Sequence, residues 1–326
     1  MDLHFDKAVK REGLDDAQLW DLLVIGGGPA GLNGALYAYR KGLKVALISQ
    51  DIGGQLHNTT EVDNYLGFQM IQGPALSDQF LEHVQSFDVP TLVGVTLKAI
   101  ERNGQNYRVV VDNGQTFETK TVLLTMGGSS RKLGVEGEEP LANRGVSYCT
   151  TCDAPFFRNR HVVVAGGGNS AAEAVLDLAA WADKITVVHR SQWRADQVLL
   201  DKFKAISNLT IHLESQILKV EGDTKMTGLT ILDKTKNETW SLKADGLFIE
   251  IGTVPNSTLV HDLVECNEQG EIIVDGHHRT SLPGLYAAGD VTDNPFKQII
   301  IATAEGAKAA LAINHYLTHE YKEETQ

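Results

Sequence analysis

Two glycine-rich turns of similar sequence, placed 140 residues apart, constrain this chain more than any other feature. Residues 21–31 read DLLVIGGGPAG, and residues 161–171 read HVVVAGGGNSA. Each begins with an apolar run typical of a buried strand, and each is followed by an Ala-rich segment, at 32–40 and 172–180, with helical composition. A second apolar strand follows each helix. The equal spacing indicates an internal duplication of a βαβ unit.

The spacing of the glycines predicts what such a unit binds. In GxGxxG, Gly26 makes a tight turn, Gly28 lets a pyrophosphate approach the backbone, and Gly31 lets helix and strand pack closely. The helix N-terminus then faces the phosphates. The strand that follows ends in Ser49 rather than an acid, so Asp51 is the nearest candidate for the ribose hydroxyls. We therefore expect an α/β fold with two Rossmann-like domains, each holding a dinucleotide.

The bulk composition narrows the class of protein. A chain of 326 residues suggests about two domains, and its net charge of −13 argues against nucleic acid or an anionic membrane as a partner. Residues 1–20 are polar, with one short helix at most, and lack the apolar stretch of a signal peptide. Three cysteines are too few for a disulfide scaffold, so we expect a cytoplasmic protein.

Two of these cysteines, Cys149 and Cys152, stand three apart and are followed at once by Asp153. A CxxC at the start of a helix suits thiol–disulfide exchange, because the helix dipole stabilises the reactive thiolate. A structural zinc is the alternative, but zinc needs four ligands. Cys266 and His161 stand at no recognised spacing from the pair. A redox dithiol is the preferred interpretation.

At this point the chain resembles the low-molecular-weight thioredoxin reductases and the related C-terminal part of the alkyl hydroperoxide reductase flavoprotein. The resemblance covers about 21–317 and rests on several motifs in order. They are GGGPAG at 26–31, GGQL at 53–56, EVDNY at 61–65, CTTCD at 149–153, GGGNSA at 166–171, IGTVPN at 251–256 and GLYAAGD at 284–290.

The family implies an interrupted FAD-binding domain at 1–130 and 253–326, and a central domain at 131–252 inserted into it. Both would have three ββα layers. The residues that would lie around the FAD are Gly26, Gly28, Pro29, Ala30, Gly31, Asp51, Gly54, Gln55, Leu56, Asn64, Met126, Gly127, Gly289, Asp290, Lys297, Gln298 and Ile299. Met126 departs from the family, which usually has threonine there.

The resemblance also implies the roles of the dithiol. Cys152 would be the sulfur nearest the flavin, and Cys149 the thiol that attacks the substrate disulfide. Asp153 would be the acid that transfers the proton when the pair is reduced or oxidised. The substrate would be thioredoxin or another disulfide protein. A homodimer is expected, and the central domain would rotate about hinges near Gly127 and Gly252 to present the dithiol to the flavin and then to the partner.

The electron donor is where the chain departs from the family pattern. The second fingerprint is intact, but NADPH-dependent members continue with His-Arg-Arg-x-x-x-Arg, whereas this chain has Ser191 in place of the second arginine and is one residue shorter before Arg194. Such arginines hold the 2′-phosphate. The residues that would form this site are Gly166, Gly168, Asn169, Ser170, Ala171, His189, Arg190, Trp193 and Arg194.

Three interpretations of the donor follow. NADPH binds through Arg190 and Arg194 at altered spacing, or ferredoxin or another reduced carrier replaces it, or a second FAD fills the site. Trp193 could stack on a flat ring or pack on the domain surface. The broken motif favours a donor other than NADPH. From a different class, a redox-sensing flavoprotein without turnover is the remaining alternative, and the complete dithiol argues against it.

Overall fold

The chain divides into two compact units. The computed structural model describes residues 14–59 and 61–322, so most of the polar segment 1–20 lies outside the described residues. Unit 1 comprises Met1–Ser129 and Val254–Gln326, and unit 2 comprises Ser130–Thr253. These divisions fall within one residue of the boundaries that the family resemblance implies.

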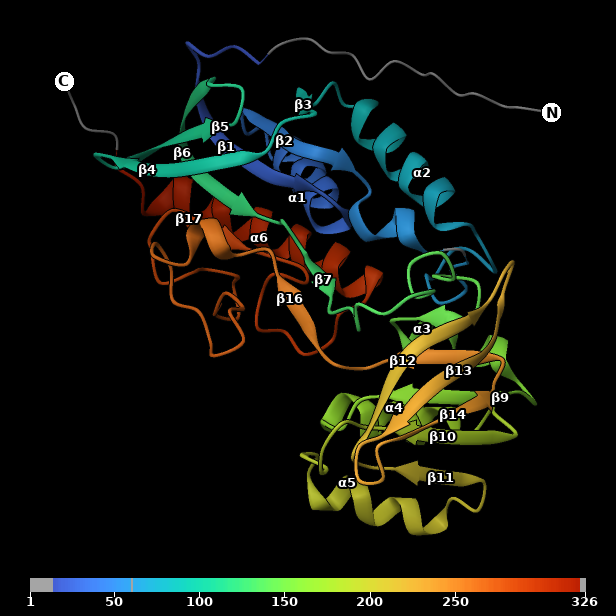
Figure 1. Cartoon of the computed structure of the whole chain (residues 1–326). Helices are drawn as coiled ribbons and strands as arrows, with labels where there is room; N and C mark the ends of the chain where they lie inside the picture. The colour runs from blue at the N-terminus through green and yellow to red at the C-terminus, as the bar shows by residue number, and fades with distance from the viewer. Residues whose placement is uncertain (1–13, 60, 323–326) are drawn as a thin grey trace. The chain divides into compact units, whose positions relative to one another are not determined.

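Unit 1 is built on a sheet with the strand order β3-β2-β1-β6-β5-β4, in which β17 also pairs with β6 (Figure 1). Its strands are β1 (Leu19–Gly27), β2 (Val45–Ile52), β3 (Thr91–Val93), β4 (Leu97–Asn103), β5 (Asn106–Val111), β6 (Thr116–Leu124) and β17 (Leu285–Ala287). The pairs that link β3, β2, β1, β6 and β17 are parallel, whereas β4, β5 and β6 form an antiparallel meander.

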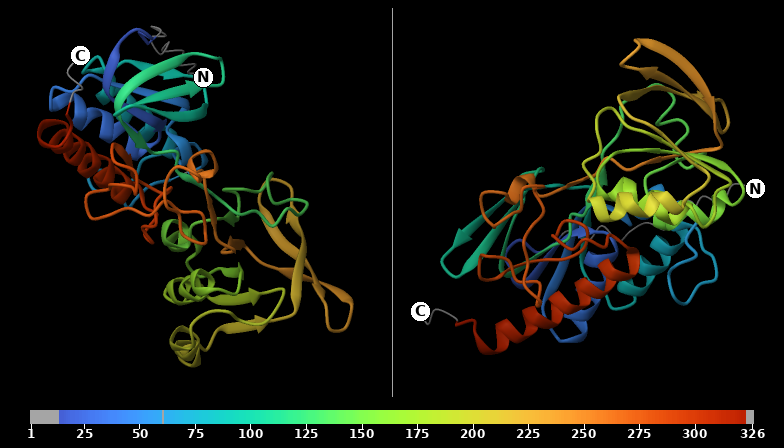
Figure 2. Two further views of the ribbon diagram at one scale, coloured as in Figure 1. Left: turned by 90° about the vertical axis from the view of Figure 1, so that its left-hand side faces the viewer. Right: turned by 90° about the horizontal axis from the view of Figure 1, so that it is seen from below.

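Alternate residues of β1 point to opposite faces of this sheet, as the pleat requires. Leu22 and Val24 belong to a core shared with α1 (Pro29–Arg40) and α6 (Ile299–His319). Leu23 and Ile25 belong to the core on the meander side. Unit 1 therefore has three layers, and α1 and α6 lie together on one side of the sheet (Figures 1 and 2). Its shorter helices are η1 (Gly54–Asn58), α2 (Gly73–Gln85) and η4 (Thr258–Val260).

Unit 2 repeats the plan around a parallel sheet of order β11-β10-β9-β15-β8, joined by an antiparallel sheet of order β12-β13-β14. The strands are β8 (Val146–Ser147), β9 (His161–Ala165), β10 (Lys184–Val188), β11 (Leu209–His212), β12 (Ser215–Gly222), β13 (Met226–Asp233), β14 (Glu238–Lys243) and β15 (Gly246–Ile249). The helices are α3 (Thr150–Asp153), η2 (Ala154–Phe157), α4 (Asn169–Leu178), α5 (Gln197–Lys202) and η3 (Phe203–Ala205). Separate apolar cores fill the two faces of the parallel sheet.

The predicted α/β class and the duplicated βαβ unit are confirmed. Both fingerprint helices begin earlier than the sequence pattern indicated, α1 at Pro29 and α4 at Asn169. The reason is local: Gly28 and Gly168 occupy the N-cap positions, so the end of each fingerprint is already helical. Proline is well tolerated at the first helical position because its missing N–H would have no helical partner there.

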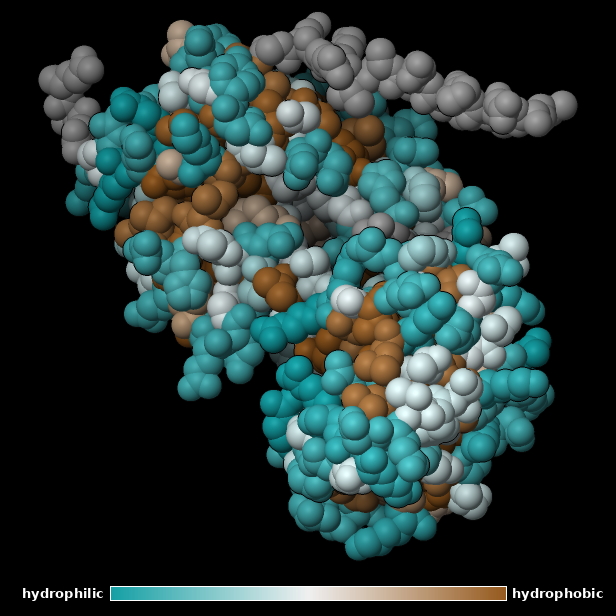
Figure 3. Space-filling view, viewed as in Figure 1, coloured by the Kyte–Doolittle hydropathy of each residue, from teal (hydrophilic) through white to brown (hydrophobic). Residues whose placement is uncertain are grey.

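Two short strands, β7 (Gly128–Ser130) and β16 (Thr253–Pro255), pair with each other where the chain crosses between the units. The preceding glycines, Gly127 and Gly252, have φ of +64° and +96°, which favours glycine. None of the helices in the described residues combines the length and the apolar character needed to cross a bilayer. Hydrophilic side chains cover much of the face seen in Figure 3, as expected for an acidic chain.

Candidate functional site

The first fingerprint forms a turn that accepts only glycine at three points, Gly26, Gly27 and Gly31, where an added Cβ would lie within 2.5 Å of a backbone oxygen. Gly26 has φ of +115°, and a Cβ there would lie 2.3 Å from the carbonyl oxygen of Thr125. A Cβ on Gly31 would lie 1.9 Å from the carbonyl oxygen of Gly26. Gly28 differs, because a Cβ there would meet nothing within 4 Å. The turn is closed on the protein side and open at Gly28, where a ligand's phosphates would approach.

The start of α1 fits such a ligand. Its N-cap, Gly28, makes no side-chain capping bond, and its first turn contains no acidic residue. The unpaired N–H groups of the first turn and the helix dipole therefore remain available to an anion. Gly54 completes the cradle, because an added Cβ there would lie 3.8 Å from Cα of Gly28. The residues present thus fit the pyrophosphate of a dinucleotide such as FAD.

The end of β2 stabilises this turn through Ser49, whose role was not predicted from the sequence. The Ser49 hydroxyl accepts the Gly27 N–H at 2.7 Å and donates to the carbonyl oxygen of Asp51 at 2.5 Å. Gly53 N–H donates to Gly27 O at 2.8 Å. The carboxylate of Asp51 is brought to the same loop, where it accepts the Gly54 N–H at 3.3 Å.

Several other predicted cofactor residues of unit 1 come together from distant parts of the chain. Asn64 donates to the side-chain oxygen of Gln298 at 3.3 Å, across 234 residues of sequence, and Gln298 is the N-cap of α6. The Gln55 amide donates to Gly128 O at 2.7 Å. Leu56 is buried in a small apolar cluster against which Ile299 packs.

The remaining predicted residues of unit 1 have mixed placements. Asp290 follows β17 and Gly289, and burial raises the pKa of its carboxyl group. Lys297 forms an ion pair with Glu271 at 3.0 Å and donates to two carbonyl oxygens, so its ammonium already has protein partners. Met126 packs its side chain against the core, and its carbonyl oxygen accepts a bond from Asn256 at 2.8 Å. Met126 and Lys297 therefore have clear structural roles.

The dithiol lies in unit 2 at the start of a single helical turn. Cys149 and Cys152 form a disulfide with Cα atoms 5.3 Å apart, and both residues are partly exposed. Cys149 is the N-cap of α3, and its sulfur accepts the backbone N–H of Cys152 at 3.3 Å. A sulfur atom that accepts an N–H bond at a helix start is well placed to become a thiolate. Asp153 ends this turn, with its N–H bonded to Cys149 O.

A second carboxyl group, absent from the sequence predictions, reaches the dithiol turn. Glu250 follows β15 directly, and one of its oxygens accepts both the hydroxyl of Thr150, at 2.6 Å, and the N–H of Thr150, at 3.3 Å. Desolvation raises the pKa of Glu250 to about 7, although its two hydrogen bonds from Thr150 act in the opposite direction. A charged residue at the carboxyl end of a buried parallel strand was the signal in the sequence.

The second fingerprint repeats the closed turn of the first. Gly166 lies under the carbonyl oxygen of Glu250, which a Cβ would approach to 2.2 Å. Gly168 is open and caps α4 without a side-chain bond. Ala171 is buried at the third position. Asn169 is engaged with the following loop, since its amide donates to the Asp196 carboxylate at 2.9 Å and its carbonyl accepts the Asp196 N–H at 2.8 Å. Ser170 is exposed.

The loop after β10 folds back onto this fingerprint. Arg194 N–H donates to Gly167 O at 2.7 Å, and the ring of His189 lies against Gly167. Desolvation, followed by the charge of Arg194, lowers the pKa of His189, which favours a neutral ring. Ser191 bonds the same ring at 3.1 Å. The side chains of Arg190 and Arg194 are exposed and form no ion pair with any described residue.

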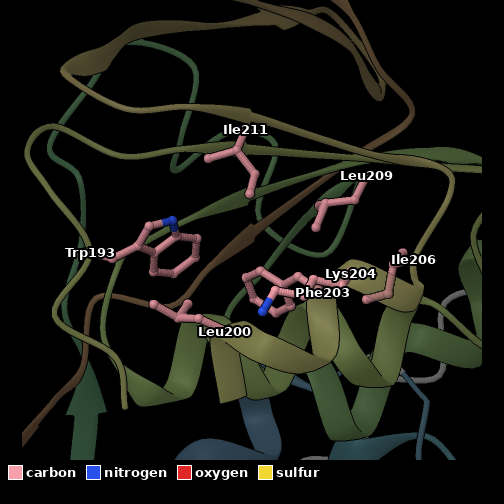
Figure 4. A pocket seen from close by; sticks show the side chains of 7 residues that line it. All are labelled: Trp193, Leu200, Phe203, Lys204, Ile206, Leu209 and Ile211. Carbon is pink, nitrogen blue, oxygen red and sulfur yellow. The ribbon is translucent and has the colours of Figure 1, made fainter. Parts of the chain in front are cut away.

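Trp193 lines an apolar pocket of about 410 Å³ (Figure 4). Its indole forms an edge contact with Phe203 at 5.5 Å, and its residue belongs to the rim of the core beside α4. The lining residues are Trp193, Leu200, Phe203, Lys204, Ile206, Leu209 and Ile211. The indole thus packs against apolar side chains of unit 2. In the described residues no group of three or more potential metal ligands is present.

Comparisons with known proteins agree with this arrangement. Residues 20–306 match the family model described as pyridine nucleotide-disulphide oxidoreductase. An alkyl hydroperoxide reductase of Staphylococcus aureus is 38% identical over 304 residues, which cover 93% of this chain and 60% of that protein. The chain thus spans 60% of the length of this curated relative.

Solved structures of similar proteins share the two-unit fold. Thioredoxin reductase from Streptococcus pyogenes is 38% identical, with a TM-score of 0.88 over 93% of this chain and 99% of that one. Thioredoxin reductase from Giardia duodenalis is 30% identical, with a TM-score of 0.86 over 92% of this chain and all of that one (100%). The chain therefore belongs to the pyridine nucleotide-disulphide oxidoreductase family.

Proposed function

We propose that the protein is an FAD-dependent dithiol–disulfide oxidoreductase of thioredoxin reductase type, which passes two electrons through Cys149 and Cys152 to a disulfide on thioredoxin or a similar protein. The observation that carries this proposal is the pair itself: a partly exposed disulfide at the start of a helical turn, with Cys149 sulfur bonded to the Cys152 N–H. The similarity to two thioredoxin reductases along nearly their whole length supports it.

FAD would lie in unit 1, with its pyrophosphate at the turn from Gly26 to Gly31 and its ribose near Asp51. Gln55, Asn64 and Asp290 are the polar groups proposed for the flavin end. When bound, the flavin would supply the electron pair that reduces the disulfide. The open face of Gly28 and the uncapped start of α1 support this placement.

The exchange step needs only the two cysteines of this chain and the disulfide of the partner. With the pair reduced, the thiolate of Cys149 attacks one sulfur of the partner's disulfide, forming a mixed disulfide and releasing one partner thiolate. Cys152 then attacks the Cys149 sulfur, which restores the internal disulfide and releases the second partner thiolate. Asp153 is the proposed acid that takes up and returns the proton of Cys152. The N–H of Cys152 supports Cys149 as the thiolate.

The donor is proposed from the second fingerprint. Arg190 and Arg194 are exposed, lack an ion pair among the described residues, and follow the strand end where a 2′-phosphate would lie. These features support NADPH at a site with altered arginine spacing. Ser191, which binds His189 where the family has an arginine, favours ferredoxin or another carrier instead. A second FAD has no support beyond the intact fingerprint itself.

The test is an anaerobic titration of the purified protein. FAD released per chain is counted, then NADPH, NADH and reduced ferredoxin are added separately while flavin absorbance and thiols formed on oxidised thioredoxin are recorded. One FAD per chain, bleached by NADPH with stoichiometric thiol formation, is the expected result. Bleaching by ferredoxin alone would support the altered donor. Flavin reduction without thiol formation on any disulfide protein would contradict the proposal.

A second candidate function comes from the 38% identity to the alkyl hydroperoxide reductase of Staphylococcus aureus. The same dithiol would then reduce the disulfide of a peroxide-reducing partner rather than thioredoxin. Supplying each partner disulfide in turn and comparing kcat/KM separates the two candidates. A homodimer in the cytoplasm, with hinge movement near Gly127 and Gly252, completes the proposal.

A further inference from the structure

Glu250 occupies a position in unit 2 that has a counterpart in unit 1. In each unit the residue directly after a central strand places its carbonyl oxygen over the first glycine of the fingerprint, Thr125 over Gly26 and Glu250 over Gly166. The side chain of Thr125 stays at that turn and donates to Ile25 O and Gly26 O. The side chain of Glu250 instead leaves its fingerprint turn and bonds Thr150, which lies between the two cysteines in the sequence.

The contact with Thr150 ties the carboxylate to the dithiol itself. Thr150 follows Cys149 in sequence and is buried, and both its hydroxyl and its N–H donate to the same Glu250 oxygen. The N–H of Cys152, two residues on, donates to the Cys149 sulfur. Two acceptors that can carry negative charge, the Glu250 carboxylate and the Cys149 thiolate, thus share the N–H groups of one helical turn.

We propose that Glu250 is a positioning residue for the dithiol: it holds the turn through Thr150, and its negative charge disfavours the thiolate of Cys149. This inference rests on the proposed exchange function of the pair. A like charge nearby raises the pKa of a thiol, so an ionised Glu250 lowers the thiolate fraction and shifts the equilibrium toward the disulfide. Protonation of Glu250 removes that effect, which couples the reducing power of the pair to pH.

Other charged groups act on the same carboxyl. Glu173 and Asp177, both on α4, repel the ionised form of Glu250 and add to the desolvation that raises its pKa. Burial also raises the pKa of Asp177. Asp153 at the end of the dithiol turn is a further acid close in sequence to the cysteines. Glu250 differs from these three because its carboxylate is the one that accepts the hydroxyl and the N–H of Thr150.

The test separates the effect of the negative charge of Glu250 from the effect of its hydrogen bonds to Thr150. Glu250→Gln keeps an amide oxygen that can accept both Thr150 bonds but removes the charge. The full-length, FAD-containing protein is reduced with dithiothreitol, freed of reductant without oxygen, and alkylated with iodoacetamide from pH 5 to 10, with each cysteine followed by mass spectrometry. The control is Glu173→Gln, which removes an exposed charge from the same surroundings without touching Thr150.

We expect the pKa of the Cys149 thiol in Glu250→Gln to fall by about one unit. At pH values above the pKa of Glu250, about 7, and below both thiol pKa values, the thiolate fraction then rises about tenfold. Alkylation there accelerates about threefold, because a weaker base is a weaker nucleophile. Above both thiol pKa values the reduced pair carries the thiolate, so its tenfold stabilisation there makes the midpoint potential of the pair about 30 mV less negative. Glu173→Gln should shift the thiol pKa by much less. A purely structural Glu250 would leave both quantities unchanged in Glu250→Gln.

A second variant guards against a folding defect. Thr150→Val removes the hydroxyl that stabilises ionised Glu250, so the thiol pKa should fall in the same direction by a smaller amount. An unchanged thiol pKa and midpoint potential in folded Glu250→Gln overturns the inference, and so does a rise in either variant. These measurements need no partner protein. If the pKa shift appears but reduced enzyme transfers no electrons to any disulfide protein, the proposed function fails while this inference stands.

Discussion

The two βαβ units have nearly the same backbone turn but differ in the side chains around it. In both, the first of three consecutive glycines lies under the carbonyl oxygen of a strand-end residue, and an added Cβ on the third would meet nothing within 4 Å. A backbone N–H of a nearby loop donates to the carbonyl oxygen of the glycine between them, from Gly53 to Gly27 and from Arg194 to Gly167. This shared part is set by sterics, because a Cβ at either first glycine would lie within 2.3 Å of a carbonyl oxygen.

The differences lie at the residues that flank the turn. Unit 1 braces its turn with the hydroxyls of Ser49 and Thr125, which are neutral at any ordinary pH. Unit 2 has His189 and Glu250 at the corresponding places, and both have shifted pKa values, although the carboxylate of Glu250 bonds Thr150 rather than the turn. The comparison teaches that the duplicated backbone provides two similar ligand cradles. The residues at the two compared positions beside the turn carry uncharged hydroxyls in unit 1 and titratable groups in unit 2.

We expect the largest effect from removing the dithiol of unit 2, because this change separates its role from that of the FAD cradle proposed for unit 1. Cys149→Ser should lower disulfide reduction by about 10³-fold or more, because a serine hydroxyl is not ionised near neutral pH and cannot replace the thiolate. FAD content should stay at the wild-type level, since the cradle proposed for it lies in unit 1. Thiol formation on oxidised thioredoxin and flavin absorbance measure the two effects. Full activity in Cys149→Ser would contradict the assigned role of the dithiol.

The next largest effect is expected from exchanging the last residue of each fingerprint, Gly31 in unit 1 and Ala171 in unit 2, which tests whether the two turns are equally closed. Gly31→Ala places a Cβ 1.9 Å from Gly26 O, so the turn must open, and we expect a loss of about 3 kcal/mol in unfolding free energy together with reduced FAD content. The reciprocal Ala171→Gly creates no clash and should cost about 1 kcal/mol, the ordinary penalty of glycine in a helix. Urea denaturation and released flavin measure both. Equal losses in the two variants would show that the turns are more alike than described.

The sequence predicted this shared scaffold well, for a physical reason. The glycine spacing, the apolar strands and the equal offsets report backbone sterics and periodicity, which are local properties. Side-chain partners such as Asn64 with Gln298, or Thr150 with Glu250, depend on long-range folding and leave no periodic pattern. The ion pair of Lys297 with Glu271 is a further long-range contact that no local pattern indicates.

The loop after the second strand gives the next test. Arg190 and Arg194 are exposed cations in unit 2, whereas positions 50 and 54 of unit 1, at the same 140-residue offset, are glutamine and glycine. If NADPH is the donor, Arg190→Ala with Arg194→Ala should raise its KM by about 10- to 100-fold through the loss of charge-assisted bonds to the 2′-phosphate. The KM for NADH should stay nearly constant. Steady-state kinetics with both nucleotides provide the measurement.

A matched control for this variant is available in the same unit. Arg158 is exposed and lies over the ring of Trp181 at 4.6 Å, so Arg158→Ala removes one positive charge without altering the loop after β10. It should leave the KM for NADPH within about twofold of wild type, since exposed charges at a distance are screened. Unchanged NADPH kinetics in the double variant, together with reduction by ferredoxin, would instead favour the altered donor.

The smallest expected effect is a pH dependence of stability that belongs to unit 2. In the folded state the pKa of Glu250 is raised to about 7 from 4.5, so as the pH rises the unfolded chain releases this proton first. The stabilisation is therefore complete below pH 4.5 and is lost as the pH rises through 7. Between about pH 6 and 8 the unfolding free energy of wild type should fall by about 1 kcal/mol relative to Glu250→Gln. Thr125→Ser, altered at the matching place in unit 1, should show no such pH-dependent difference. Urea denaturation at each pH decides the matter, and parallel pH curves for wild type and Glu250→Gln would remove the electrostatic distinction between the two units.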